Sequence, residues 1–131
     1  MTNSVSAAYQ PTNKKTLLTI SIVTYNPNFA ELEKTLNSLK IALNGFVDES
    51  FSITIVDNSV SDEVASFLRR NYAELPVKLI HGQGNVGFGR AHNIAIQQMG
   101  EFHLILNPDI QLAPDALVNA LAFMRENENC G

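Results

Sequence analysis

Two segments of this chain carry residue types whose order suits the binding of a diphosphate and a cation. Residues 81–96, HGQGNVGFGRAHNIAI, read as a glycine-rich loop that opens into a helix. Backbone N–H groups in such a loop and at a helix N-terminus bind phosphate groups. Residues 102–110, FHLILNPDI, read as a strand that ends on Asn107 and Asp109. These oxygen ligands suit Mg²⁺ or Mn²⁺, which also bind substrate phosphates, so the two segments together predict a site for a nucleotide-diphosphate ligand.

Two further strand-like runs also end on polar residues. Thr24-Tyr25-Asn26 closes the apolar run 17–25, and Asp57-Asn58-Ser59 closes the run 51–57. The first trio offers a hydroxyl and an amide to a base or phosphate, although Asn-Pro dipeptides also begin ordinary turns. Asp57 can accept a hydrogen bond from a pyrimidine ring N–H or a ribose hydroxyl, although it also suits an Asx turn. Taken alone, neither trio distinguishes the two interpretations.

The rest of the sequence predicts the elements that position these segments. Apolar spacing and turn residues predict strands at 17–25, 51–57, 77–81 and 102–107, and helices at 28–43, 61–72, from the glycine loop to about 99, and from 114 or 115 to about 126. Asn28 with Glu31 resembles a capping box, and Ser61 is a candidate cap for the second helix. The order β-α-β-α-β-α-β-α is typical of an α/β fold with a doubly wound, mostly parallel sheet. Ligands bind outside the carboxyl ends of such strands, where all four polar segments fall.

Composition limits the class of protein. The chain has 131 residues, is 45% hydrophobic and carries a formal net charge of −4, which suits one globular domain. Basic residues are not clustered, so no nucleic-acid partner is expected. Cys130 is the only cysteine, so it signals neither an internal disulfide nor a zinc site. Residues 1–15 are polar and unlike a signal peptide, and we interpret them as a flexible tail before a domain at 16–131.

The glycine-rich loop also permits a dinucleotide-binding interpretation. Gly82, Gly84 and Gly87 form a G-x-G-x-x-G pattern, and Asp109 follows the third glycine by about 22 residues. Against this, the pattern follows the third predicted strand, whereas the dinucleotide fingerprint belongs to the first β-to-α turn. Asn85, Arg90 and Asn93 add polar groups that the fingerprint does not need. We give no role to His92, interpreted as a solvated helix residue, and read His81 and His103 as structural because they lack metal-ligand spacing.

The ordered set SIVTYN, ITIVDNS, GNVGFGRAHNIAI and LILNPDI resembles the N-terminal half of a family 2 inverting glycosyltransferase of the GT-A fold, in its rhamnosyltransferase-like branch. The resemblance covers residues 17–128 and implies a nucleoside-diphosphate-sugar donor, UDP- or dTDP-linked. It implies that Asp57 contacts the base and that Asp109 is the principal ligand of Mg²⁺ or Mn²⁺, with Asn107 in the first place of the family's Asp-x-Asp motif. The candidate donor-binding residues are Thr24, Tyr25, Asn26, Asp57, Asn58, Asn85, Gly87, Arg90, Asn93 and Asn107.

The resemblance also implies what the rest of such an enzyme does. Family members are longer, and their later half binds the acceptor and supplies the general base, so no catalytic residue is assigned in this chain. We therefore expect an incomplete, truncated subdomain that binds the donor of an enzyme transferring sugar to a glycan or lipid-linked acceptor in cell-surface polysaccharide synthesis. A cytoplasmic location, or a peripheral one at the inner face of the membrane, fits this activity. An unpaired sheet edge and an uncovered helix face predict self-association.

Three other interpretations remain open from the sequence. The first is the dinucleotide-binding domain described above. The second is a sugar nucleotidyltransferase, which is disfavoured because its glycine-rich loop follows the first strand, where this chain has TYNPN. The third is a binding module that uses the pocket without chemistry.

Overall fold

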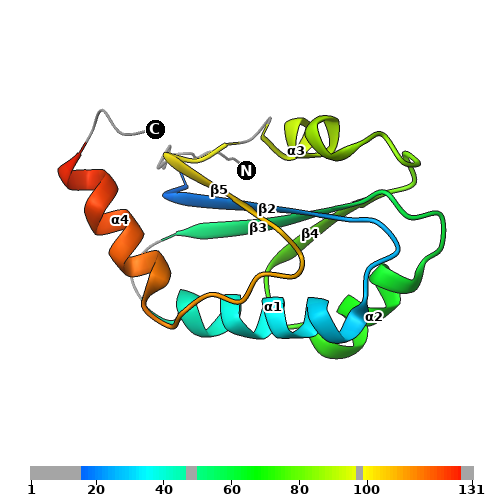
Figure 1. Ribbon diagram of the computed structural model, residues 1–131, viewed down its shortest axis with the longest axis horizontal. Coiled ribbons are helices and arrows are strands. Elements are labelled where there is room, and N and C mark those ends of the chain that lie inside the picture. The colour runs from blue at the N-terminus through cyan, green and yellow to red at the C-terminus, as the bar shows by residue number, and fades with distance from the viewer. Residues whose placement is uncertain (1–15, 47–49, 97–98, 128–131) are drawn as a thin grey trace, which may run out of the picture.

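The computed structural model describes residues 16–46, 50–96 and 99–127, and strands and helices alternate along them. The element labels are those of Figure 1. In chain order the elements are β2 (Leu18–Thr24), α1 (Phe29–Leu43), β3 (Phe51–Asp57), α2 (Glu63–Asn71), β4 (Val77–His81), α3 (Phe88–Ile96), β5 (Phe102–Leu106) and α4 (Ala116–Glu126). The predicted alternation is confirmed, and the bounds of β3 and β4 match the prediction.

The strands form one parallel sheet in the order β4-β3-β2-β5. The central strand β2 pairs with β3, where Thr24 lies opposite Asp57, and with β5, where Ile22 lies opposite Leu106. Figure 1 shows α1 and α2 on one face of the sheet, α3 on the other, and α4 beside the amino ends of the strands. All carboxyl ends therefore lie at one edge of the sheet, as the sequence predicts.

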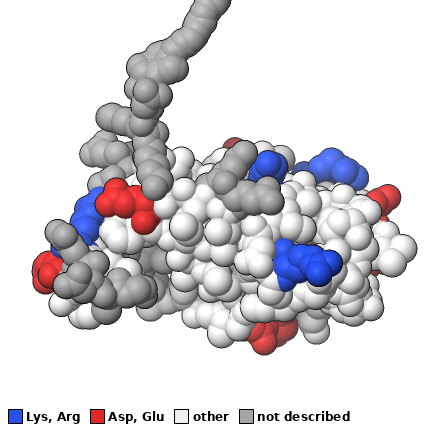
Figure 2. Space-filling view, turned by 90° about the horizontal axis from the view of Figure 1, so that it is seen from above, with Lys and Arg blue, Asp and Glu red and all other residues white. Residues whose placement is uncertain are grey.

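The two faces of the sheet differ in polarity because successive side chains of a strand point to opposite faces. Ile20, Ile22, Ile53 and Ile55 face α1 and α2 and are at most 1% exposed. The face toward α3 carries the polar side chains Thr19 and Ser21 of β2, which are also buried. A small apolar cluster, made of Val23, Val56, Ala91 and Ala95 with Ile80 and Val86, supports α3 there. Figure 2, which views this side, shows scattered charged side chains on a mostly uncharged visible surface.

Helix starts follow local capping chemistry. The Asn28 side chain accepts a hydrogen bond from the Glu31 N–H at 3.1 Å, which confirms Asn28 as the cap of α1. The second helix begins at Glu63 with Asp62 in the N-cap position, so the candidate cap Ser61 lies one residue before it, although its Oγ accepts from the Glu63 N–H at 3.5 Å. The last helix begins at Ala116, just after the predicted start.

Two expectations lie outside the described residues: the tail at 1–15 and the lone Cys130. Within the described ranges, no helix combines the length and hydropathy needed to span a bilayer.

Candidate functional site

The carboxylate of Asp57 is the central polar group at the carboxyl edge of the sheet. Its side chain is completely buried. Oδ1 accepts hydrogen bonds from Thr24 Oγ1 at 2.9 Å and from the Ser59 N–H at 3.1 Å. Oδ2 is buried without a hydrogen-bond partner among the described residues. An unpaired buried carboxylate oxygen is energetically costly. A small shift of the residues around Asp57 would let an N–H group of a ligand reach Oδ2, and this hydrogen bond would remove the cost.

His81, the last residue of β4, lies between two carboxylates. Its Nε2 is 3.1 Å from the Ser59 carbonyl and 3.7 Å from Asp57 Oδ2, and its Nδ1 is 3.7 Å from Asp62 Oδ1. Because a carbonyl can only accept, Nε2 carries the hydrogen in this arrangement. His81 was read from the sequence as structural, and its position beside the free oxygen of Asp57 depends on the pairing of β3 with β4.

A chain of amide contacts joins the glycine-rich loop to the end of β3. Gln83 Nε2 donates to the Asp57 carbonyl at 2.9 Å and to Asn58 Oδ1 at 3.0 Å. Asn58 Nδ2 in turn donates to the Gly87 carbonyl at 3.4 Å. Backbone carbonyls at both ends accept only, so the orientation of both side-chain amides is fixed. Gln83 was missed by sequence reasoning, since a glutamine between glycines has no distinctive spacing.

The loop itself depends on glycine for its backbone. Gly82, Gly84 and Gly87 have φ values of 103°, 77° and 89°, a region that side chains with a Cβ rarely adopt. The Asn85 side chain accepts from the Gly87 N–H at 3.1 Å, which closes a turn directly before α3. Asn85 therefore shapes the turn of the loop, and its role at a donor pocket stays a prediction.

The first strand end is joined to the second and borders an open groove. The Asn26 N–H donates to Ser59 Oγ at 2.7 Å, and Asn26 itself has a positive φ of 43°. The groove, of about 510 Å³, runs between the starts of α1 and α2 and includes the exposed ring of Tyr25. Two other candidates, Arg90 and Asn93, lie exposed on α3. The structure thus brings together the strand ends at Thr24–Asn26 and Asp57–Ser59 and the glycine-rich loop.

The fourth segment, the Asn107-Pro108-Asp109 turn, lies on the face of the sheet that α1 covers, whereas the glycine-rich loop leads into α3 on the other face. The Ile110 N–H donates to the Asn107 carbonyl at 3.2 Å, and Thr35 Oγ1 of α1 donates to the Pro108 carbonyl at 2.9 Å. Figure 1 shows the chain turning back there and running along α1 toward α4. Asp109 is exposed at this turn. In the described part of the chain, no three His, Cys, Asp or Glu residues gather into a metal site.

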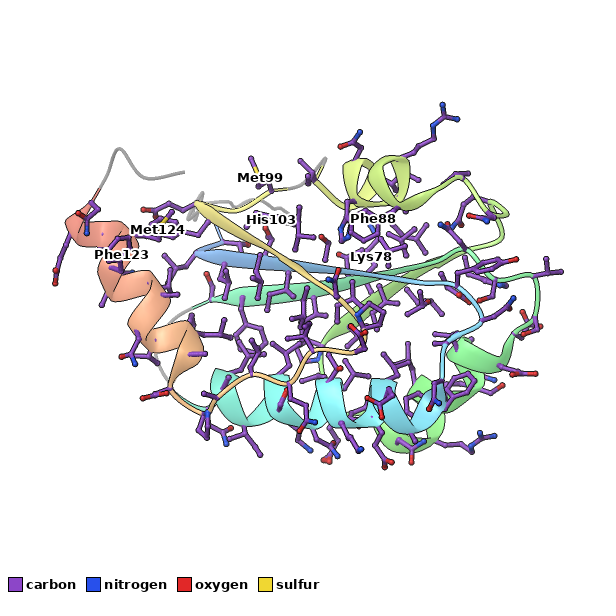
Figure 3. All side chains as sticks on the ribbon, in the orientation of Figure 1. Lys78, Phe88, Met99, His103, Phe123 and Met124 are labelled. Carbon is purple, nitrogen blue, oxygen red and sulfur yellow. The ribbon has the colours of Figure 1, made fainter. Side chains whose placement is uncertain are left out.

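One expectation about α3 is wrong: His92 is not solvated. It is 3% exposed, and its Nδ1 lies 2.7 Å from Ser21 Oγ on β2. Ala91 and Ala95, small residues four apart, place this side of α3 against the sheet, and that spacing was the signal available in the sequence. Burial lowers the pKa of His92, and the neighbouring His103 lowers it further. Figure 3 shows His103 on the α3 side of the sheet.

Comparison with known proteins decides the family. The sequence model of glycosyl transferase family 2 matches residues 19–131. This chain belongs to that family. It is 30% identical over 119 residues to an N-acetylglucosaminyl-diphospho-decaprenol L-rhamnosyltransferase of Mycobacterium tuberculosis, a match that covers 79% of this chain and 36% of the relative. It is 28% identical over 112 residues to the poly(ribitol-phosphate) beta-N-acetylglucosaminyltransferase TarS of Staphylococcus aureus, covering 84% of this chain and 19% of TarS.

Solved structures of other glycosyltransferases share the fold of this family 2 chain. S. aureus TarS 1–349 in complex with UDP-GlcNAc superposes with a TM-score of 0.67 at 26% identity, over 84% of this chain and 31% of TarS 1–349. The mannosyltransferase PcManGT from Pyrobaculum calidifontis, in complex with GDP-Man and Mn²⁺, gives a TM-score of 0.68 at 24% identity, over 93% of this chain and 36% of PcManGT, and supports the fold alone. The GT-A fold is confirmed, and the dinucleotide-binding alternative is not favoured. The chain spans about a third or less of these relatives.

Proposed function

We propose that this family 2 chain binds a nucleoside-diphosphate-sugar donor, UDP- or dTDP-linked, at the carboxyl edge of its sheet. The observation that carries the proposal is the buried Asp57 carboxylate. One of its oxygens is fixed by Thr24 and Ser59, while the other has no hydrogen-bond partner among the described residues and lies 3.7 Å from His81 Nε2. A single unpaired acceptor suits the single ring N–H of uracil or thymine. The adjoining groove at Tyr25 and Asn26 would take the rest of the nucleoside.

We assign the diphosphate of the donor to the Asn107-Pro108-Asp109 turn, on the α1 side of the carboxyl edge. Asp109 and Asn107 offer a carboxylate and an amide oxygen, the donor set that Mg²⁺ and Mn²⁺ prefer, and both are exposed. These residues would hold the metal, with the diphosphate as its other ligand. A divalent metal bound there would supply positive charge to the leaving diphosphate. Arg90 and Asn93, exposed on α3, are assigned to the same donor.

The whole protein is proposed to be a transferase. Its acceptor is a glycan or lipid-linked saccharide of cell-surface polysaccharide synthesis, at the cytoplasm or the inner membrane face. An inverting transfer needs a general base opposite the leaving group, and this contributes about 10²–10⁴-fold to such rates. We assign no residue of this chain to that role. Residues 16–131 are accordingly proposed to bind the donor without transferring its sugar.

Calorimetry tests this proposal directly. UDP-N-acetylglucosamine and dTDP-rhamnose are titrated into the folded chain at pH 8, with Mg²⁺ or Mn²⁺ and again with a chelator. We expect binding that metal strengthens and that NAD⁺ does not compete away. Absence of binding to both donors, with metal present and native circular dichroism, would overturn the proposal. Competition by NAD⁺ would revive the dinucleotide interpretation.

A further inference from the structure

A partly buried chain of hydrogen bonds fastens α3 to the sheet. His92 Nδ1 on α3 lies 2.7 Å from Ser21 Oγ on β2, and the same hydroxyl lies 2.9 Å from His103 Nε2 on β5. His103 Nδ1 lies 2.7 Å from Thr19 Oγ1, which accepts from the Gly100 N–H at 3.0 Å. We call these four side chains the histidine network. It joins α3 and β5 to β2, with sequence separations of 71 residues between His92 and Ser21 and 82 residues between His103 and Ser21.

The network keeps all of its hydrogen bonds only while at least one of the two histidines is neutral. The Ser21 hydroxyl has one hydrogen to donate, so it can receive a hydrogen from one imidazole and give its own to the other. A first added proton places a charge on a buried ring. A second makes both rings donors to Ser21 Oγ, and its own hydrogen then has no acceptor in the network. Two cations would also share one hydroxyl, which is strongly unfavourable at low dielectric.

Among the described residues that line the groove beside His103, no acidic group compensates such a charge. His103 lines a groove of about 470 Å³ on the α3 side of the sheet. Among the described residues that line this groove, Lys78 of β4 is the other charged or titratable side chain. The other polar side chains there, Thr19, Ser52 and Thr54, are neutral hydroxyls, and no carboxylate is among the described residues that line the groove. On α3 itself, His92 packs edge-on against the Phe88 ring at 4.4 Å, and its Nε2 is buried without a partner. Burial lowers the pKa of both histidines accordingly.

The histidine network fastens the helix that follows the glycine-rich loop, at one end of the proposed donor site. Helix α3 begins directly after the glycine-rich loop, and the Gly87 carbonyl accepts from both Ala91 N–H, at 3.1 Å, and Asn58 Nδ2. Apart from the network, α3 rests on the sheet through the small apolar cluster around Ala91 and Ala95. Figure 3 shows the labelled His103 and Phe88 on this same side of the sheet.

We infer that His92 is a positioning residue that holds α3 and the glycine-rich loop in the donor-binding arrangement while at least one histidine of the network is neutral, and that protonation of both histidines releases them. Donor binding is therefore sensitive to mild acid. This inference rests on the proposed function for its ligand, but the release of α3 is a property of the chain by itself. The two parts are measured separately.

Hydrogen exchange of the α3 amides, residues 88–96, measures the release without any ligand. After correction for the intrinsic effect of pH on exchange, we expect wild-type protection to fall between pH 8 and pH 5. His92→Asn keeps a side-chain amide near the place of Nδ1 but cannot be charged, so its protection changes little over that range. His92→Ala loses the contact and is poorly protected at every pH. His81→Gln is the matched histidine control, judged by exchange alone, and should keep the wild-type pH response.

Donor affinity is measured on the same variants with UDP-N-acetylglucosamine and Mg²⁺, whose diphosphate diester does not titrate in this range. We expect the wild-type affinity to fall by about tenfold or more from pH 8 to pH 5, the change that one unit of altered proton affinity produces. For His92→Asn we expect about threefold or less. Donor binding with equal acid sensitivity in wild type and His92→Asn would overturn the inference, as would an unchanged exchange profile in wild type.

Failure of the proposed function gives a different result. If wild type binds neither donor at pH 8, the donor assignment falls, and the exchange measurement alone then decides whether the network anchors α3. Should His92→Ala fail to fold, Ser21→Ala removes the shared hydroxyl and leaves both histidines in place. Its α3 is expected to be poorly protected at pH 8, and full protection there would overturn the inference.

Discussion

Asp57 and Asp109 are both carboxylates at strand ends, but their surroundings differ in kind. Asp57 is fully buried and held by two hydrogen bonds on one oxygen, whereas Asp109 is exposed on a turn fixed to α1. A buried acceptor selects ligands that place an N–H group opposite it, because any other ligand leaves the buried oxygen without a hydrogen bond. An exposed carboxylate can take a hydrated cation without a desolvation cost.

Substitution of each carboxylate should therefore change a different part of donor binding. We expect Asp109→Ala to remove the metal dependence and leave weak metal-independent binding. Asp57→Ala should weaken binding with and without metal, because it removes the acceptor for the base. Calorimetry with Mg²⁺ and with a chelator distinguishes the two. Selective loss of the metal effect in Asp57→Ala would show that the roles are reversed.

Thr24→Val tests the support of Asp57. Valine keeps the shape of threonine but removes the hydroxyl that donates to Asp57 Oδ1. We expect a loss of about 1–3 kcal/mol in the free energy of unfolding, because a buried carboxylate loses one of its two donors. Urea denaturation measures it. Thr54→Val, on the partly buried face of β3, is the matched control and should change stability by less.

At the scale of single residues, the sequence predicts the polar side chains at strand ends. It does not predict the side chains whose hydrogen-bond partners lie on another element. Thr24, Asp57 and Asn58 follow buried runs, which the strand pattern shows. Gln83 and His92 act through contacts across 25 and 71 positions of sequence, respectively, to Asn58 and Ser21. Such contacts depend on how the strands pair and on which side of α3 faces the sheet.

The glycine-rich loop and α3 behave as one element. The loop ends at Gly87, whose backbone joins it both to Asn58 and to the first turn of α3. The sequence predicts the loop-to-helix transition well, because glycines and the alanine spacing are local signals. The structure describes α3 as far as Ile96, and residues 97–98, just before the expected end near 99, lie outside the described residues.

Two glycines that flank Phe88 give a matched test of the loop. We expect Gly87→Ala to destabilise the chain by about 1–2 kcal/mol, because φ at Gly87 is 89° and an added Cβ meets no other obstacle. Gly89→Ala lies inside α3 with open space around the new Cβ, and should stabilise by about 0.5–1 kcal/mol. Thermal melts compare them, and donor affinity should fall only for Gly87→Ala. Equal effects would contradict this account of the loop.

The buried histidines also make folding stability depend on pH. Burial lowers the pKa of His92 and of His103 in the folded state, so the unfolded chain binds more protons in acid. The free energy of unfolding should be unaffected by this pair above the unfolded value of about 6.5 and should fall as the pH drops below it, down through the lowered pKa values. Urea denaturation at pH 8, 6.5 and 5 measures this. The double variant His92→Asn, His103→Gln should give a flatter profile.

On the scale of the whole molecule, the pattern of elements predicts the fold almost completely. Alternating runs give the parallel sheet, and the family match agrees with it. What the sequence did not predict is the unequal polarity of the two sheet faces, although β2 alternates apolar and hydroxyl residues from Leu18 to Ile22. We interpreted that run as uniformly apolar because β-branched residues dominate it.

Exposed apolar side chains remain on α4 and on β5. Phe123 is 54% exposed, Val118 41% and Ile105 49%. Figure 3 shows Phe123 and Met124 on α4, at the end of the molecule away from the carboxyl edge. We expect the chain to self-associate through this surface, and Phe123→Lys to weaken the association. Sedimentation velocity over a range of concentrations measures it, and a strictly monomeric wild type would contradict the expectation.

The strand order has a consequence for how the chain folds as it is made. β2 pairs with β3 at a separation of 33 residues, from Leu18 to Phe51, but with β5 at 84, from Leu18 to Phe102. Because N-terminal segments emerge first and long loops close slowly, β2, β3 and β4 can assemble before β5 exists. β2 is therefore an edge strand until β5 emerges and pairs with it. Because β5 carries His103, the hydrogen bond between His103 and Ser21 can form only after that pairing, whereas His92 can reach Ser21 earlier.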